Sequence, residues 1–245
     1  MQTIPGAISD GESALPSSKS ATVSLSGMNA AFAKGEDFLR GVTFEAQAGS
    51  VVSILGPAAS GKSMLMEVLR LALPPSAGVA RILSADATKL PYTQRARLKR
   101  RIGFMHQTPV LAEHLSAFDN VALPLRITGV KPESFSADVE ELMSFVGLPE
   151  NDTRPAHALS GSERRRVAAA RAVVAQPRLV LADEPTAGLS ADLAGRVMRL
   201  IVSMRRAGAA VVVATQDETL AASLAGPHWR MNAGRIALVT SGAAP

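Results

Sequence analysis

Apolar residues along this chain follow two different periods. Short continuous or alternating runs are typical of strands, whereas spacings of three and four residues predict helices. The short runs predict strands at 23–25, 42–46, 51–55, 79–83, 101–105, 179–182 and 210–214. The longer spacing predicts helices at 64–70, 92–99, 115–125, 134–146, 163–174 and 191–206.

The order of these elements predicts an α/β fold. Strands that alternate with helices favour a largely parallel sheet with crossover helices. The first two strands suggest an antiparallel edge that leads into the strand at 51–55, and the helices between 108 and 174 look inserted. Residues 1–20 are rich in Ser, Pro, Gly and Ala without an apolar period, so we expect a disordered tail there.

The segment between the strand at 51–55 and the next helix is a candidate phosphate-binding loop. It fits the pattern G-x-x-x-x-G-K-[ST], in which backbone N–H groups converge on phosphate oxygens at a helix N-terminus. Lys62 would reach the β- and γ-phosphates, and the Ser63 hydroxyl would bind Mg²⁺. The residues of the loop are Gly56, Pro57, Ala58, Ala59, Ser60, Gly61, Lys62 and Ser63.

Two carboxylates follow the apolar strand at 179–182. Ligands of α/β sheets bind at the carboxyl ends of the strands, which is where Asp183 and Glu184 stand. Asp183 would hold Mg²⁺, and Glu184 would orient and deprotonate an attacking water. Two acids after a buried strand are often only a capped turn, but the phosphate loop upstream favours a functional pair.

A Leu-Ser-Gly segment opens the helix predicted at 163–174. Ser160 followed by Glu163 fits a capping box, and this alone accounts for the two residues locally. Small residues with free N–H groups at a helix start also form an anion site, so both roles can be filled at once. The candidate segment comprises Ser160, Gly161, Ser162 and Glu163.

Composition and charge narrow the class of protein. The 245 residues include no cysteine, which excludes disulfides and thiolate metal sites, and no run of eighteen apolar residues occurs. The N-terminus has no basic segment followed by an apolar one, so we expect no secretory signal. The net charge is +5, with a basic cluster at 95–101. Because no aromatic residues interleave with these charges, a solvated helix face is favoured and direct nucleic-acid binding is not expected.

The order of the motifs resembles the ATP-binding-cassette (ABC) ATPases over nearly all of residues 21–239. The resemblance implies a P-loop NTPase (RecA-like) core with an antiparallel β subdomain at 21–107 and 178–241, and a helical subdomain at 108–177. It implies ATP and Mg²⁺ as ligands, with Gln107 contacting Mg²⁺ and reporting on the γ-phosphate. Phe32 matches the aromatic residue that stacks on adenine.

The same resemblance implies how chains assemble. Two chains would enclose two ATP molecules, each bound by one chain's phosphate loop and the other chain's segment at 160–163. Segments 98–104, 118–125 and 170–174 are similar to FtsE, the cell-division ATPase that works with the membrane protein FtsX. The related lipoprotein-release and macrolide-export ATPases share part of this pattern. We therefore expect a peripheral subunit at the cytoplasmic face of the membrane, bound to an FtsX-like partner and pairing with itself or a paralogue.

Three positions depart from the family pattern. Gln216 stands where the family has a histidine that contacts the γ-phosphate, and Gln cannot carry a positive charge. Ser190 replaces an aspartate of the loop that crosses the dimer interface, and Ser162 replaces a glycine that approaches the γ-phosphate. We therefore expect normal ATP binding with slow hydrolysis. A nucleotide-sensing scaffold with little hydrolysis and a lipoprotein-release or export ATPase are the alternatives.

Overall fold

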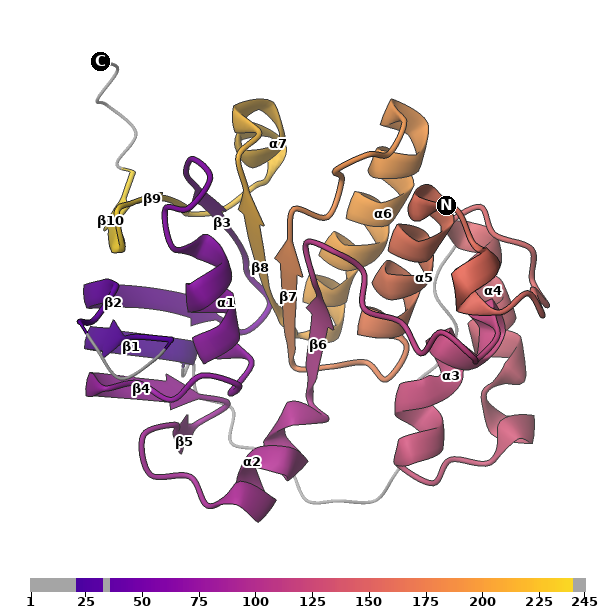
Figure 1. Cartoon of the computed structure of the whole chain (residues 1–245), viewed down its shortest axis with the longest axis horizontal. Coiled ribbons are helices and arrows are strands. Elements are labelled where there is room, and N and C mark those ends of the chain that lie inside the picture. Colours follow the sequence, from indigo (N-terminus) through magenta and orange to yellow (C-terminus); the bar gives the residue numbers. More distant parts are fainter. Residues whose placement is uncertain (1–20, 33–35, 240–245) are drawn as a thin grey trace.

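The computed structural model describes residues 21–32 and 36–239 (Figure 1). The tail expected at 1–20 lies outside the described residues. The fold is α/β, as the alternation of strands and helices predicts. Two sheets and the helices around them make up the described part of the chain, and the strands that carry the candidate residues lie in the larger sheet.

The larger sheet has six strands in the order β10-β9-β3-β8-β7-β6. The pairs β9–β3, β3–β8, β8–β7 and β7–β6 are parallel, so these five strands end at the same edge, and β10 pairs antiparallel with β9. Every residue of β7 and β8 is buried, which is typical of a strand covered on both faces. The strands are β3 (Val51–Leu55), β6 (Ile102–Met105), β7 (Leu179–Asp183), β8 (Ala210–Thr215), β9 (His228–Asn232) and β10 (Arg235–Leu238).

The smaller sheet is the antiparallel β subdomain that the family resemblance implies, and it corrects the expectation of an edge leading into the strand at 51–55. The first two strands do not form an edge of the sheet that contains β3; they belong to a separate antiparallel sheet in the order β2-β1-β4-β5. These strands are longer than predicted because their apolar residues alternate with exposed ones, leaving one face to be buried. The strands are β1 (Ala21–Ala30), β2 (Leu39–Gln47), β4 (Ala77–Ile82) and β5 (Ala85–Asp86).

The helix after the phosphate loop joins the two sheets. α1 (Lys62–Leu69) begins directly after Gly61 and ends before the prolines at 74 and 75, as predicted. Its side chain Leu65 shares one core with Phe44 of β2 and Val212 of β8, and Figure 1 shows α1 between the smaller sheet and β8. Burial of these apolar surfaces holds the phosphate loop rigidly between the two sheets.

Most of the other helices cover the side of the larger sheet formed by β6 and β7 (Figure 1). The helical block after 108 contains three of them, and their apolar faces share a second core with the buried residues of α6. Gly103 of β6 lets the strand approach α5, since a Cβ there would lie 1.8 Å from the Ala172 carbonyl oxygen. The helices are α3 (Ala117–Ile127), α4 (Ser136–Phe145), α5 (Gly161–Val173) and α6 (Ala191–Ser203).

Two further helices lie at the surface. α2 (Tyr92–Lys99) buries none of its residues, which agrees with the expectation that the basic cluster is a solvated face. α7 (Glu218–Ser223) was not predicted, and neither were β5, β9 and β10. These elements are short, and β9 and β10 mix polar with apolar residues, so their periodicity is too weak to identify.

Candidate nucleotide-binding site

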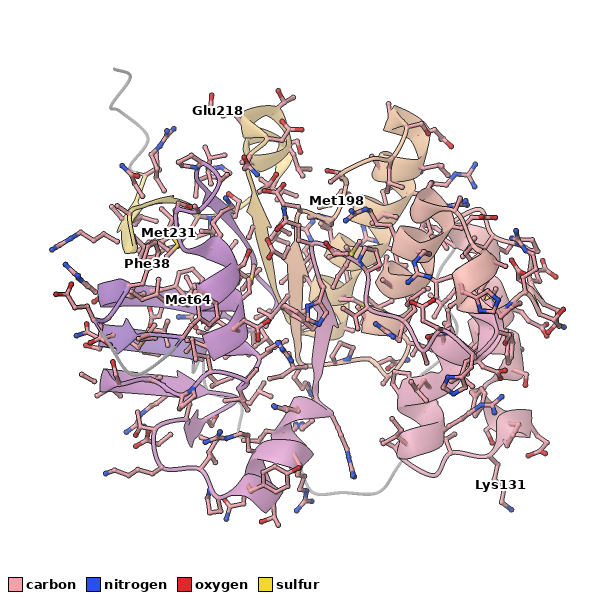
Figure 2. All side chains as sticks on the ribbon, in the orientation of Figure 1. Phe38, Met64, Lys131, Met198, Glu218 and Met231 are labelled. Atoms are coloured by element: carbon pink, nitrogen blue, oxygen red, sulfur yellow. The ribbon has the colours of Figure 1, made fainter. Side chains whose placement is uncertain are left out.

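The phosphate loop is shaped by glycines at its two ends. At Gly56 a Cβ would lie 2.3 Å from the Met231 carbonyl oxygen, so only glycine fits there. Gly61 has φ 111°, a conformation that side chains rarely adopt, and it precedes the first residue of α1. A Cβ at Gly61 would also crowd Phe38 and Met231, which Figure 2 labels close together. The N–H groups at the start of α1 are thereby free to meet an anion.

The loop forms one wall of a cleft at the carboxyl ends of the parallel strands. Its volume is about 490 Å³, within the range that holds a small-molecule ligand. Candidate residues from β6, β7 and β8, far apart in sequence, meet the loop in this cleft. The lining residues are Phe32, Phe38, Ala58, Ala59, Ser60, Gly61, Lys62, Ser63, Met64, Gln107, Asp183, Glu184 and Gln216.

Lys62 is a buried cation at the centre of the cleft. Its Nζ donates to the carbonyl oxygens of Gly56 at 2.6 Å and Pro57 at 2.9 Å, and it lies 4.0 Å from a carboxylate oxygen of Glu184. Burial lowers the pKa of Lys62, and the negative charges of Glu184 and Asp183 oppose that effect. A phosphate oxygen would bring a full negative charge to an ammonium that is held partly out of water.

Asp183 and Glu184 leave polar atoms without partners. Within the described residues, Asp183 Oδ1, Glu184 Oε1 and Ser60 Oγ are buried and have no hydrogen-bond partner. Burial raises the pKa of Asp183, against a hydrogen bond with Ser63 that lowers it. Buried polar groups in native proteins are normally satisfied, so these atoms indicate a place for a ligand or ion.

The backbone of Glu184 is fixed in an unusual conformation. Its φ is +47°, in the left-handed region that costs a residue other than glycine roughly 1–3 kcal/mol. Its N–H donates to the Ala214 carbonyl oxygen at 2.9 Å, and its Oε2 accepts from the Thr215 hydroxyl at 3.0 Å. The Glu184 carbonyl oxygen accepts from Arg165 Nη1 at 3.1 Å. These contacts leave Oε1, which lies 4.0 Å from Lys62 Nζ, as the carboxylate oxygen without a hydrogen bond among the described residues.

The predicted segment at 160–163 lies outside the lining of the cleft. Ser160 and Glu163 form the expected capping box at the start of α5, and Arg154 pairs with the same carboxylate at 2.6 Å. Gly161 is exposed, and a Cβ there would meet no atom within 4 Å. The segment is therefore open to a second molecule, and does not contribute to its own chain's cleft. Ser190, the N-cap residue of α6, is also exposed and outside the lining.

The capping box predicts a specific loss of stability in acid. Hydrogen bonds from Arg154 and Ser160 lower the pKa of Glu163 from 4.5 to about 2. A depressed carboxyl pKa stabilises the fold above the unfolded pKa and ceases to do so as pH falls through the folded pKa. The stability difference between the natural chain and Glu163→Gln should thus be constant above about pH 5 and shrink below it.

Urea unfolding at about pH 7, 5 and 3.5 would measure this difference. Glu45→Gln, at an exposed position of β2, is the matched control and should show no comparable trend. An equal difference between Glu163→Gln and the natural chain at all three pH values would refute the assignment.

The cleft has the features that ATP and Mg²⁺ require. Phe32 is 68% exposed at its rim, so a ring face is free for stacking on a base. Among the described residues, no three His, Cys, Asp or Glu side chains form a metal cluster. Mg²⁺ suits the carboxylate of Asp183 in the lining, because this ion commonly takes one or two carboxylates together with phosphate oxygens and water. Ser63, Gln107 and Asp183 are the protein groups in the lining that fit it.

Sequence reasoning missed several residues of the site. Phe38 lines the cleft but has no motif around it, and Met64 lines it from the first turn of α1. Thr215 is the polar end of an otherwise apolar strand, a signal that could have been noticed. Arg165 is the second of three consecutive arginines, and the sequence does not indicate which of them contacts Glu184. Gln107 and Gln216, both predicted, do reach the cleft.

Comparisons with known proteins agree with this geometry. A family model described as ABC transporter matches residues 39–187. The lipoprotein-releasing system ATP-binding protein LolD of Novosphingobium aromaticivorans is 39% identical over 76% of this chain and 84% of that protein. The macrolide export ATP-binding/permease protein MacB of Chromobacterium violaceum is 36% identical over 82% of this chain and 32% of that protein.

The fold is shared with solved ATP-binding cassettes. The dimeric structure of the cassette MJ0796 in a post-hydrolysis state, bound to ADP and Pi, superposes with a TM-score of 0.83 and 27% identity. The superposition covers 91% of this chain and all of the MJ0796 chain. The relatives named above carry lipoprotein-release and export names, so the comparisons support the lipoprotein-release alternative better than the FtsE branch. No helix among the described residues has the length and apolar character needed to span a membrane.

Proposed function

The chain belongs to the ABC transporter family of ATP hydrolases, and we propose that it is the ATP-binding subunit of a lipoprotein-release or export complex. The observation that carries the proposal is the meeting of the phosphate loop with Gln107, Asp183 and Glu184 in one cleft. Its similarity to LolD and MacB supports that class of complex. A cell-division role of the FtsE kind has no comparable support.

The phosphate loop and the aromatic residue at the rim would bind different parts of ATP. Phe32 offers its ring face to the adenine, and the loop N–H groups hold the phosphates. Lys62 exchanges its bonds to the loop carbonyls for the terminal phosphates. The exchange is favourable because a charge-assisted bond to phosphate is stronger than a bond to a neutral carbonyl.

Magnesium would be held by Ser63, Gln107 and Asp183 together with the phosphates. When bound, it neutralises charge on the phosphate oxygens during transfer. Asp183 supports this role because its buried Oδ1 has no partner among the described residues. Glu184 accepts the proton of the attacking water at Oε1, which has no hydrogen bond among the described residues and faces Lys62 only at 4.0 Å, while Thr215 fixes Oε2. Gln216 lines the same cleft and can donate a hydrogen bond to the terminal phosphate.

A second cassette completes the site. The segment Ser160, Gly161, Ser162 and Glu163 is open at the start of α5 and does not line its own chain's cleft. The capping box uses the N–H groups of Ser160 and Glu163, which leaves those of Gly161 and Ser162 for the phosphates of an ATP bound by the other chain. The dimeric state of the similar MJ0796 cassette supports this arrangement. The partner cassette is a second copy or a paralogue that brings the residues altered here.

Hydrolysis is expected to be slow. Gln216, Ser190 and Ser162 each alter a contact that the family resemblance implies, and the loss of one such contact commonly costs about a hundredfold in rate. Losses within one site need not add. We expect a steady-state turnover below about 1 per second for the complex with its membrane subunit, measured by phosphate release. A faster rate would contradict the slow-site hypothesis.

A subunit of this class would be bound at the cytoplasmic face of the membrane. The class of complex is therefore tested by purifying the chain, with its bound subunits, from membranes. Co-purification with a polytopic subunit, followed by ATP-dependent release of a lipoprotein from proteoliposomes, is the expected result. Release of a drug-like substrate instead would identify the complex as an export complex. ATP-dependent assembly without release would favour a nucleotide-sensing scaffold. Absence of any membrane subunit would overturn the proposal.

A further inference from the structure

Arg165 connects α5 to the backbone of Glu184. It lies in the second turn of α5, after the open segment at 160–163, and its Nη1 donates to the Glu184 carbonyl oxygen at 3.1 Å. The two residues are 19 positions apart in sequence. This contact joins the helix that begins at the open segment to the backbone of the proposed catalytic residue.

The neighbouring arginines do not share this contact. Arg164 pairs with the exposed Glu113, and Arg166 donates to the carbonyl oxygens of Val146 and Gly147. The three side chains follow one another around the helix, so they point in different directions. Arg165 is the member of the run that faces Glu184.

The partial burial of Arg165 disfavours its charged form. Burial lowers the pKa of Arg165, and the negative charge of Glu184 is the opposing influence. A charge that is partly removed from water destabilises the fold unless it is paired or hydrogen-bonded. The bond to the Glu184 carbonyl and the nearby carboxylate are the compensation that the structure provides.

The contact acts on a residue whose backbone is strained. Glu184 has φ +47°, and its carbonyl oxygen also accepts from the Ala187 N–H at 3.3 Å. A left-handed residue other than glycine persists only where its surroundings hold it. A donor on the carbonyl side therefore helps to keep the Glu184 carboxylate aimed into the cleft.

We propose that Arg165 is a positioning residue, which holds the backbone of Glu184 and places a positive charge beside that residue. The inference rests on the proposed role of Glu184 in hydrolysis. Arg165 lies in the same helix as the open segment, about one turn after it, so the residue that holds Glu184 is close to the segment proposed to meet a second cassette. A purely structural role would change stability and leave turnover intact.

The test compares three substitutions in the complete complex. Arg165→Met removes charge and donor, Arg165→Gln keeps a donor without charge, and Arg165→Lys keeps both. We expect Arg165→Met to lower kcat for ATP by about tenfold to a hundredfold with KM within about twofold, because small misplacements of a catalytic group have effects of that size. Arg165→Lys should recover most of the rate, and Arg165→Gln should recover less.

The control is Arg199→Met, at an exposed arginine of α6, and it should retain the natural rate. A kcat for Arg165→Met within twofold of the natural complex would overturn the inference, as would a loss that Arg165→Lys does not relieve. Glu184→Gln is measured in parallel. Natural turnover in that variant refutes the proposed role of Glu184, whereas its loss beside an unaffected Arg165→Met refutes only the positioning role.

Discussion

Replacing Lys62 with alanine is expected to weaken ATP binding by roughly a hundredfold, to the point where the full-length chain no longer binds at ordinary concentrations. The reason lies in the burial of the ammonium. It is 5% exposed, and its neighbours Glu184 and Asp183 are negative. Without Lys62 the terminal phosphates would face these carboxylates with no cation of the chain between them. Truncation of a buried, hydrogen-bonded charge typically costs about 2–5 kcal/mol.

Isothermal titration with a non-hydrolysable ATP analogue measures this effect directly. Lys131→Ala is the matched control, because Lys131 is an exposed lysine at the far end of the molecule (Figure 2). It should bind as the natural chain does. Lys62 also donates to two loop carbonyls, so thermal unfolding of Lys62→Ala without nucleotide checks that the loop stays folded. An unchanged affinity in a folded Lys62→Ala chain would refute the site assignment.

The local motifs of the site could be predicted because their geometry is encoded over a few residues. Gly56 and Gly61 indicate a bend that side chains would block, and the structure shows the reason at each. Asp183 follows an apolar strand, and a buried parallel strand ends where ligands bind. The family resemblance, and not this reasoning, assigned Gln107 and Gln216 to the site; in the structure they follow β6 and β8. Parallel pairing then brings all three to one edge.

Contacts between distant segments could not be predicted in the same way. Thr215 and Arg165 both donate hydrogen bonds to Glu184. No sequence motif indicates either contact, because each depends on how β8 or α5 packs against the segment that follows β7. Phe38 enters the cleft because β2 begins beside the phosphate loop. These residues acquire their surroundings only from tertiary packing, which local periodicity does not describe.

The separate smaller sheet illustrates the same limit on a larger scale. The apolar alternation in β1 and β2 identifies a half-buried strand, but does not say which sheet covers it. The structure pairs β1 with β4, a strand about fifty residues later, and buries Phe44 against α1 and the larger sheet. Non-local pairing decided the arrangement.

Replacing Glu184 with glutamine is expected to lower ATP turnover by about a hundredfold or more, with ATP affinity within a few-fold of the natural value. Glutamine has the size of glutamate and can still accept from the Thr215 hydroxyl, so the left-handed turn should survive. What it cannot do is take a proton at the position of Oε1. Binding depends on the phosphate loop, which Glu184 approaches only at the 4.0 Å separation between Oε1 and Lys62 Nζ. The variant therefore separates binding from hydrolysis.

Single-turnover hydrolysis in the complete complex is the appropriate measurement, because it remains informative when the natural rate is slow. Glu218→Gln is the control: Glu218 lies at the start of α7 (Figure 2), and its carboxylate is exposed and 3.6 Å from Arg230. It should hydrolyse ATP at the natural rate. If Glu184→Gln did the same, another group would have to take the proton. The hydrogen bond from Thr215 to Oε2 would then have no part in hydrolysis, because it acts only on the Glu184 carboxylate.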